Sequence, residues 1–317
     1  MIIVMLDGYT TNPGDLSFEE FGSFGEFISY DRTPKTKEAV LERAQDADII
    51  ITNKTPITPQ IIDNLTKCRY IGLMSTGYDA VDVGYARKCG ITVSNVPMYT
   101  TDAVAQMTFA HILNIFNFVA QNNELVHSGS WTKCKDFCFW DRPLSELSGK
   151  TIGLFGFGRI GKAVAKIANA FNMNVISYSR TKFAHEYVKY VDFDTLLRES
   201  DILSLHAPFN ESTNLIINRD SIEKMKDGAV LINTSRGKMI DDYALADALK
   251  SGKLKAAGVD VLTNEPPKED NPLLGCENCY ITPHISWAAV ETRERLIGIT
   301  LSNLRAFLDG KPQNEVF

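Results

Sequence analysis

The chain has 317 residues, enough for about two domains, and its 44% hydrophobic and 23% charged residues are typical of a soluble globular protein. Its 33 basic and 39 acidic residues give a formal net charge of −6, which argues against nucleic acid or an anionic membrane as a partner. We expect neither a secretory leader nor a membrane span, and the six cysteines are therefore expected to be reduced thiols in a cytoplasmic protein.

Short apolar runs alternate with helical patterns over roughly the first hundred residues. Strands are predicted at residues 2–6, 27–30, 48–52, 70–74 and 91–94, and the clearest helices at 36–47 and 58–68. This alternation predicts a parallel sheet with helices on both faces. Ser75, Thr76 and Gly77 directly follow the fourth run, at the edge where such sheets bind ligands, although a plain strand-to-helix turn explains them equally well.

Residues 102–127 predict one long helix that is apolar on most sides and therefore buried. We interpret His111 on this helix as an interior structural histidine and not as a metal ligand. The irregular segment that follows, residues 130–148, is rich in aromatic side chains, which predicts an interface with a second subunit and hence a homodimer. These aromatic residues are Trp131, Phe137, Phe139 and Trp140.

A dinucleotide-binding fingerprint begins halfway along the chain. The apolar run 151–155 is followed by Gly156, Gly158 and Gly161 in G-x-G-x-x-G spacing, and then by a helical pattern. The first glycine permits a tight turn, the second lets the backbone approach a pyrophosphate, and the third lets the helix pack closely on the strand. The helix N-terminus offers N–H donors to the phosphates. The segment therefore predicts an NAD or NADP site.

The residues after the next predicted strand, 174–178, bear on which nicotinamide is bound. Sites that prefer NAD usually carry an acidic residue there, but no carboxylate occurs between Phe171 and Phe183. Arg180, together with Ser179 and Lys182, favours the 2′-phosphate of NADP. An arginine can also stack on adenine, so NAD remains open.

The same alternation continues to the end of the chain and predicts a second doubly wound domain. Further strands are expected at 201–206, 229–233, 256–261 and 280–282, with the best-patterned helix at 241–251 and a final amphipathic helix at 291–308. Two close cysteine pairs, Cys134 with Cys138 and Cys276 with Cys279, are better interpreted as buried or incidental thiols than as a metal or redox site, and we expect no metal.

Three later segments complete a pattern: Asn233-Thr234-Ser235-Arg236-Gly237, residues 260–266 with Asp260 and Glu265, and residues 282–287 with His284. In this order after the fingerprint, the chain resembles the D-isomer-specific 2-hydroxyacid dehydrogenase family over nearly its whole length. Within that family it is most similar to the glycerate dehydrogenases (hydroxypyruvate reductases). The resemblance implies an α/β fold in which a Rossmann nucleotide-binding domain, residues 100–285, is inserted into a flavodoxin-like substrate domain, residues 1–99 and 286–317.

Residue chemistry supports a catalytic set of Arg236, Glu265 and His284. Arg236 offers a charged planar fork for a substrate carboxylate. His284 is suited to acid–base work, and Glu265, if hydrogen-bonded to it, would keep the imidazolium charged. The resemblance further implies that Ser75, Thr76 and Gly77 bind the substrate, Asp260 the nicotinamide amide, and Arg159, Ile160 and Thr234 the pyrophosphate region.

The function implied is NAD(P)H-dependent reduction of a small 2-oxo acid to the D-2-hydroxy acid, and the reverse. The expected pairs are hydroxypyruvate/D-glycerate and glyoxylate/glycolate. Alternatives within the family are D-lactate, 3-phosphoglycerate or a bulkier acid. Outside enzymes, dinucleotide-sensing corepressors share this fold and its Arg/Glu/His set, but no basic region or disordered tail supports that role.

Overall fold

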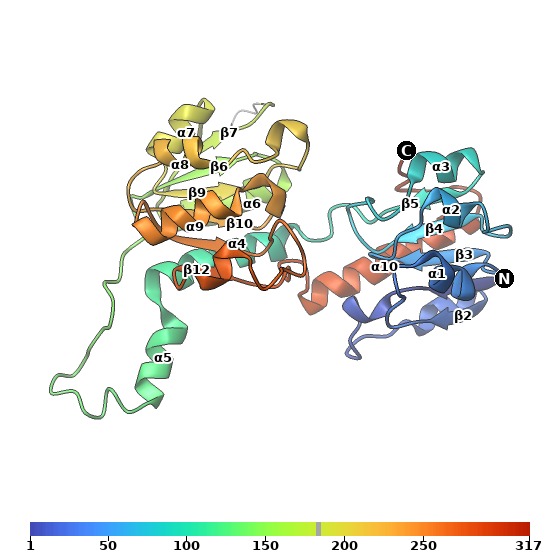
Figure 1. Ribbon diagram of the computed structural model, residues 1–317, viewed down its shortest axis with the longest axis horizontal. Coiled ribbons are helices and arrows are strands. Elements are labelled where there is room, and N and C mark those ends of the chain that lie inside the picture. Colours follow the sequence, from blue (N-terminus) through green and yellow to red (C-terminus); the bar gives the residue numbers. More distant parts are fainter. Residues whose placement is uncertain (182–184) are drawn as a thin grey trace. The chain divides into compact units, whose positions relative to one another are not determined.

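The computed structural model describes residues 1–181 and 185–317, and the chain divides into two compact units. The first unit comprises Met1–Thr100 and Ala288–Phe317, and the second comprises Thr101–Trp287. Each unit is built around one parallel sheet with helices packed on it (Figure 1). The predicted class, two doubly wound α/β domains, is confirmed.

The sheet of the first unit has five parallel strands in the order β2-β1-β3-β4-β5. This is the flavodoxin-like order, in which the chain starts near one edge and then winds to the other. The interior strands β3 and β4 are buried along their whole length, as expected for strands covered by helices on both faces. The strands are β1 (Ile2–Met5), β2 (Glu26–Ser29), β3 (Ile49–Thr52), β4 (Tyr70–Leu73) and β5 (Thr92–Ser94).

The helices of the first unit are α1 (Lys37–Ala44), α2 (Pro59–Ile62), α3 (Val83–Lys88) and α10 (Val290–Leu308). Thr36 caps α1 by accepting a hydrogen bond from the Ala39 N–H. The helix predicted over residues 58–68 is wrong in length, because α2 ends at Ile62. Beyond it the backbone closes successive tight turns, with the N–H groups of Asn64 and Leu65 bonded three residues back.

The sheet of the second unit has seven parallel strands in the order β12-β11-β10-β9-β6-β7-β8. Counted from β6, this is the Rossmann order 3-2-1-4-5-6 with one further strand, and the strand order reverses between β6 and β9. The sequence missed β8, a short edge strand. The strands are β6 (Thr151–Phe155), β7 (Asn174–Tyr178), β8 (Val188–Tyr190), β9 (Ile202–Leu205), β10 (Ala229–Asn233), β11 (Leu254–Val259) and β12 (Cys279–Ile281).

Two apolar cores cover the two faces of this sheet. One contains the inward side chains of α7 (Phe193–Glu199), α8 (Arg219–Lys224) and α9 (Asp242–Ser251). The other contains those of α4 (Thr101–Asn117) and α6 (Arg159–Ala170). Helix α4 is therefore a central packing element of the second unit, as its apolar composition predicts.

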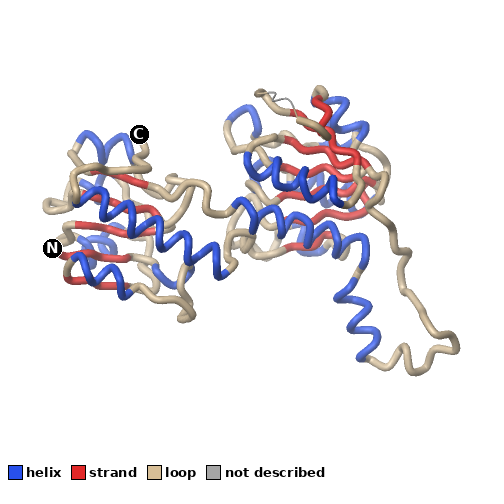
Figure 2. Tube along the Cα trace, turned by 180° about the vertical axis from the view of Figure 1, so that it is seen from behind, coloured by secondary structure: helices blue, strands red, loops and turns tan. Residues whose placement is uncertain are grey.

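The single long helix predicted over residues 102–127 is wrong. Phe118 adopts a left-handed conformation with φ +50°, which separates α4 from α5 (Val119–His127), and the two helices are bent by 53°. The Asn122 side chain donates to the Phe118 carbonyl at this break. No residue of α5 is buried, and Figures 1 and 2 show α5 leading away from the sheet of the second unit. Burial was thus predicted correctly for α4 and wrongly for α5.

Within the described residues, no single helix is long and apolar enough to cross a membrane. Only the bent pair of α4 and α5 passes the length and composition test together.

Candidate active site

The fingerprint turn follows β6 at the point where the strand order reverses. Gly156 has φ +102°, and a Cβ atom there would lie 2.7 Å from the Ala207 backbone nitrogen, so only glycine fits. Its N–H donates to the Tyr178 carbonyl at 2.9 Å, which ties the turn to the end of β7. A Cβ atom on Gly161 would collide with the Gly156 carbonyl oxygen, so this glycine lets α6 start close to the strand.

The N-terminus of α6 lies open beside this turn. Gly158 precedes the helix in an extended conformation, and a Cβ atom there would meet nothing within 4 Å. Arg159, Ile160 and Gly161 form the first helical turn, where N–H groups have no acceptor inside the helix. Free N–H donors, the positive end of the helix dipole and open space fit a pyrophosphate group.

The residues predicted to distinguish NADP from NAD follow β7. Ser179 is half-buried and Arg180 is exposed. The Tyr178 carbonyl accepts a hydrogen bond from the Gly156 N–H, so Ser179 and Arg180 directly follow a residue that contacts the fingerprint turn. Lys182 lies outside the described residues.

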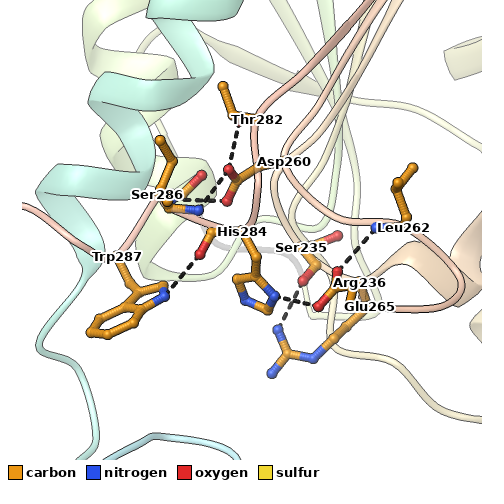
Figure 3. A network of polar contacts seen from close by, with 10 residues as sticks. Ser235, Arg236, Asp260, Leu262, Glu265, Thr282, His284, Ser286 and Trp287 are labelled. Carbon is orange, nitrogen blue, oxygen red and sulfur yellow. Dashed lines mark hydrogen bonds and ion pairs between the residues drawn. The ribbon is translucent and has the colours of Figure 1, made fainter. Parts of the chain in front are cut away.

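Three neighbouring strands bring the predicted catalytic residues to one edge of the sheet. β10, β11 and β12 pair in parallel, so their carboxyl ends meet at the same edge. Arg236 follows β10, Glu265 follows β11 and His284 follows β12. Figure 3 shows the loops after these strands converging.

Glu265 and His284 form a close pair. Nδ1 of His284 lies 2.6 Å from Oε2 of Glu265, and both side chains are 36% exposed. Oε1 of Glu265 accepts the Leu262 N–H at 3.0 Å, which orients the carboxylate. Nε2 of His284 has no hydrogen-bond partner among the described residues. The ring is thus oriented through one nitrogen and keeps the other for a ligand.

A side-chain turn after β10 presents Arg236. The Asn233 side chain accepts hydrogen bonds from the N–H and hydroxyl of Ser235 and donates to the Arg236 carbonyl at 3.0 Å. The Arg236 side chain is exposed, and its Nη1 donates to the Ser235 carbonyl at 2.8 Å. In Figure 3 the guanidinium group and the His284 ring point to the same side of the loops. The guanidinium keeps further donors for an anionic ligand.

Asp260 organises the loop that carries His284. Its carboxylate is 1% exposed and accepts three hydrogen bonds, from the Thr282 hydroxyl at 2.6 Å and from the N–H groups of Ile285 and Ser286 at 2.8 Å each. The sequence implied a cofactor contact for Asp260 and missed this role. A buried acid needs such partners, so an aspartate ending an apolar strand was the available signal.

His284 has an unusual backbone conformation. Its φ of +56° lies in the left-handed region, which residues other than glycine rarely adopt. Its N–H donates to the carbonyls of Asp260 and Thr282, and its own carbonyl accepts the indole N–H of Trp287 at 2.9 Å. These contacts hold a conformation that the residue would not adopt alone. Trp287 belongs to the motif, but the sequence suggested no role for it.

His111 is buried, as interpreted from the sequence. It is 5% exposed, and its Nε2 lies 3.0 Å from the Thr282 hydroxyl oxygen. Thr234 is also buried, and its hydroxyl contacts that of Thr108 on α4 at 3.1 Å. Among the described residues no group of three or more potential metal ligands occurs, and the six cysteines are free thiols.

The segment Ser75-Thr76-Gly77 forms the loop after β4 in the first unit. The Ser75 hydroxyl donates to the Gly77 carbonyl at 2.6 Å, and the Thr76 hydroxyl donates to the Val96 carbonyl at 2.8 Å. The N–H groups of Thr76 and Gly77 have no hydrogen-bond acceptor within the described part of the chain. This loop therefore offers two backbone donors at the carboxyl edge of its sheet.

Comparisons with known proteins show which family the chain is similar to. Residues 109–286 match the model of the D-isomer specific 2-hydroxyacid dehydrogenase NAD binding domain. A hydroxypyruvate reductase of Blautia hydrogenotrophica is 48% identical over 100% of this chain and 99% of that protein. A glycerate dehydrogenase of Methylorubrum extorquens is 36% identical over 95% of each chain. The solved NADPH-dependent glyoxylate/hydroxypyruvate reductase of Sinorhizobium meliloti, in complex with citrate, is 29% identical with a TM-score of 0.85, covering 99% of this chain and 97% of that one.

Proposed function

The chain belongs to the D-isomer-specific 2-hydroxyacid dehydrogenases and is an NAD(P)H-dependent reductase of small 2-oxo acids, and we propose that hydroxypyruvate, reduced to D-glycerate, is its main substrate. The observation that carries the catalytic assignment is the His284–Glu265 pair, with His284 Nε2 open on the side to which Arg236 points. The substrate assignment is supported by the 48% identity to a hydroxypyruvate reductase along the whole chain.

The proposed chemistry divides the reduction between cofactor and protein. When bound, the reduced nicotinamide supplies a hydride to the carbonyl carbon. His284 gives the proton from Nε2 to the carbonyl oxygen, so that the 2-oxo acid becomes the 2-hydroxy acid. The Glu265 carboxylate at Nδ1 stabilises the imidazolium before this transfer.

Arg236 would bind the carboxylate group, which all 2-oxo acids share. A guanidinium fork matches a carboxylate through two parallel hydrogen bonds and also polarises the adjacent carbonyl. The N–H groups of Thr76 and Gly77, which have no acceptor among the described residues, support the further proposal that this loop binds a substrate carboxylate. We further propose that Asp260 contacts the nicotinamide amide in addition to its loop contacts, because among the described residues its Oδ2 accepts a single hydrogen bond, from the Ser286 N–H.

For the cofactor, we propose a preference for NADPH. Arg180 is exposed directly after β7, next to the fingerprint turn, and no acidic residue replaces it there. An arginine at this position can pair with a 2′-phosphate, whereas an acidic residue would repel it. The related reductase of Sinorhizobium meliloti is described as NADPH-dependent.

A cytoplasmic location, where thiols stay reduced, fits the free cysteines and stays a prediction.

We also propose that a second copy of this chain covers α5 and residues 128–148. No residue of α5 is buried, and Trp131, Phe137 and Trp140 are 49%, 89% and 65% exposed. A cavity of about 590 Å³ is lined partly by residues 144–148 of this segment, and apolar side chains such as Phe171 lie beside polar ones in its wall. Exposed aromatic side chains gathered in one segment are typical of subunit interfaces. We call α5 and residues 128–148 the arm.

The substrate proposal predicts an order of kcat/KM across a panel of 2-oxo acids with each reduced cofactor. Hydroxypyruvate should rank first, followed by glyoxylate, with pyruvate and bulkier acids well below. Steady-state kinetics by nicotinamide absorbance measures this order. A higher kcat/KM for any other acid would overturn the substrate assignment, and turnover of none would revive the corepressor interpretation.

The variant Arg236→Lys is the control that links this panel to the site. It keeps the charge but loses the fork, so kcat/KM should fall about tenfold or more for every acid, because all carry the carboxylate. A loss confined to one acid, or none at all, would contradict the proposed contact.

The cofactor proposal predicts that Arg180→Ala lowers the ratio of NADPH to NADH kcat/KM about tenfold, because a charge-assisted contact to the 2′-phosphate is lost. The matched control is Arg198→Ala, another surface arginine of the second unit, 58% exposed, which should leave the ratio unchanged. An unchanged ratio in Arg180→Ala would remove this residue from cofactor selection.

The dimer proposal predicts that light scattering gives twice the chain mass of 35.3 kDa at micromolar concentration. Replacing Phe137 and Trp140 together by Asp should give monomers, because two charges would have to be buried in the interface. Tyr243→Asp, a change at a 68% exposed residue away from the arm, should remain dimeric. A monomeric wild-type protein would sink the proposal.

A further inference from the structure

Helix α4 places two polar side chains in an otherwise apolar core. Thr108 and His111 are three residues apart, so they share one face of the helix. Each is buried, and each reaches a loop at the carboxyl edge of the sheet: Thr108 contacts Thr234 after β10, and His111 contacts Thr282 after β12. Burying polar groups costs free energy unless they are paired, and these two contacts provide the pairing.

The contact of His111 continues as a directed chain of hydrogen bonds. The Thr282 hydroxyl donates its single proton to Oδ1 of Asp260 at 2.6 Å. Its oxygen must therefore accept from Nε2 of His111, 3.0 Å away, which fixes the neutral ring as the Nε2–H tautomer. Asp260 in turn accepts the N–H groups of Ile285 and Ser286, the two residues after His284.

Close packing holds the His111 ring in position for its hydrogen bond to Thr282. A Cβ atom on Gly258 of β11 would lie 2.7 Å from the His111 Cβ and 2.9 Å from its Cγ, so the ring rests directly on the strand backbone. Burial lowers the pKa of His111, against the opposing effect of the Asp260 carboxylate. The ring is therefore neutral at neutral pH, and a single tautomer is maintained.

We propose that His111 is a positioning residue for the reduction: through Thr282 and Asp260 it fixes the loop that holds the His284 ring against Glu265. His111 contacts neither substrate nor cofactor in this proposal. Its imidazole N–H sets the hydroxyl direction of Thr282, and that hydroxyl sets the carboxylate that orders residues 284–286. The inference rests on the proposed role of His284 as proton donor.

A different role would be purely structural, with His111 filling space and merely satisfying its own nitrogen. Methionine and glutamine distinguish the two roles, because their side chains are similar in length and volume and only glutamine carries an N–H donor near the position of the imidazole Nε2. A space-filling role predicts equal behaviour of the two variants. A positioning role predicts that only glutamine supports catalysis.

The experiment measures kcat at saturating cofactor and hydroxypyruvate for His111→Met and His111→Gln, with cofactor dissociation constants measured separately. We expect His111→Met to lower kcat about tenfold, since a small displacement of a reacting group is enough for such a loss. His111→Gln should keep kcat within about threefold of wild type. Cofactor dissociation constants should change much less than kcat in both variants, because the fingerprint turn that binds the pyrophosphate is not touched.

A second pair of variants tests the route and remains informative if His111→Met fails to fold. Thr282→Val removes the hydroxyl at nearly constant volume and should lower kcat as His111→Met does, whereas Thr282→Ser should retain it. Combining His111→Met with Thr282→Val should cost no more than the larger single loss, because both break the same chain.

Equal kcat in His111→Met and His111→Gln, whether normal or reduced, would overturn the inference, and so would a normal kcat in Thr282→Val. Multiplicative losses in the double variant would also overturn it. The variant His284→Gln separates this result from the proposed function. If His284→Gln retains the wild-type rate, the proposed proton-donor role of His284 fails. If His284→Gln is inactive while His111→Met and Thr282→Val have normal kcat, only the proposed role of His111 fails.

Discussion

The buried carboxylate of Asp260 constrains the edge of the second unit's sheet at which we propose that catalysis takes place. A charge that is 1% exposed must be hydrogen-bonded by the protein, and all three of its donors belong to residues 282–286. Satisfying this carboxylate fixes the loop after β12, and the loop sets the left-handed backbone of His284. The position of the proposed proton donor is thus a consequence of where β11 ends.

The sheet topology distributes the chemistry along one edge. The fingerprint follows β6 at the reversal point, and Arg236, Glu265 and His284 follow β10, β11 and β12. β9 and β10 lie between the fingerprint strand β6 and the strands β11 and β12, which precede Glu265 and His284. Loops along one edge of the sheet can therefore hold the hydride donor and the proton donor at the same carbonyl group. Holding reacting groups in position in this way lowers the barrier to reaction.

Much of this site was predictable from local sequence, because its signals are local. The glycine spacing, the apolar strand before it and the amphipathic helix after it lie within a span of about 20 residues. The pairing of Glu265 with His284 followed from residue chemistry and family resemblance, and the two side chains lie together. The contact of His111 with Thr282 joins residues 171 positions apart and depends on how α4 packs against β11, so no sequence pattern indicated it.

The errors have the same origin. The break at Phe118 depends on one left-handed residue, and a periodic apolar pattern does not reveal it. Edge strand β8 has three residues and exposes Lys189, so it carries little strand signal. The loop contacts of Asp260 were missed because the donors around its carboxylate become neighbours only through the pairing of β11 with β12.

The central claim is that Glu265 acts on the substrate only through His284, and a double-mutant cycle on kcat/KM for 2-oxo acid reduction tests it most directly. Glu265→Gln alone should lower kcat/KM about tenfold or more, because the imidazolium loses its carboxylate partner. In a His284→Gln background the same change should have almost no effect, since no imidazolium remains to be stabilised. If Glu265→Gln costs the same factor with and without His284, the two residues act independently and this account of the site is wrong.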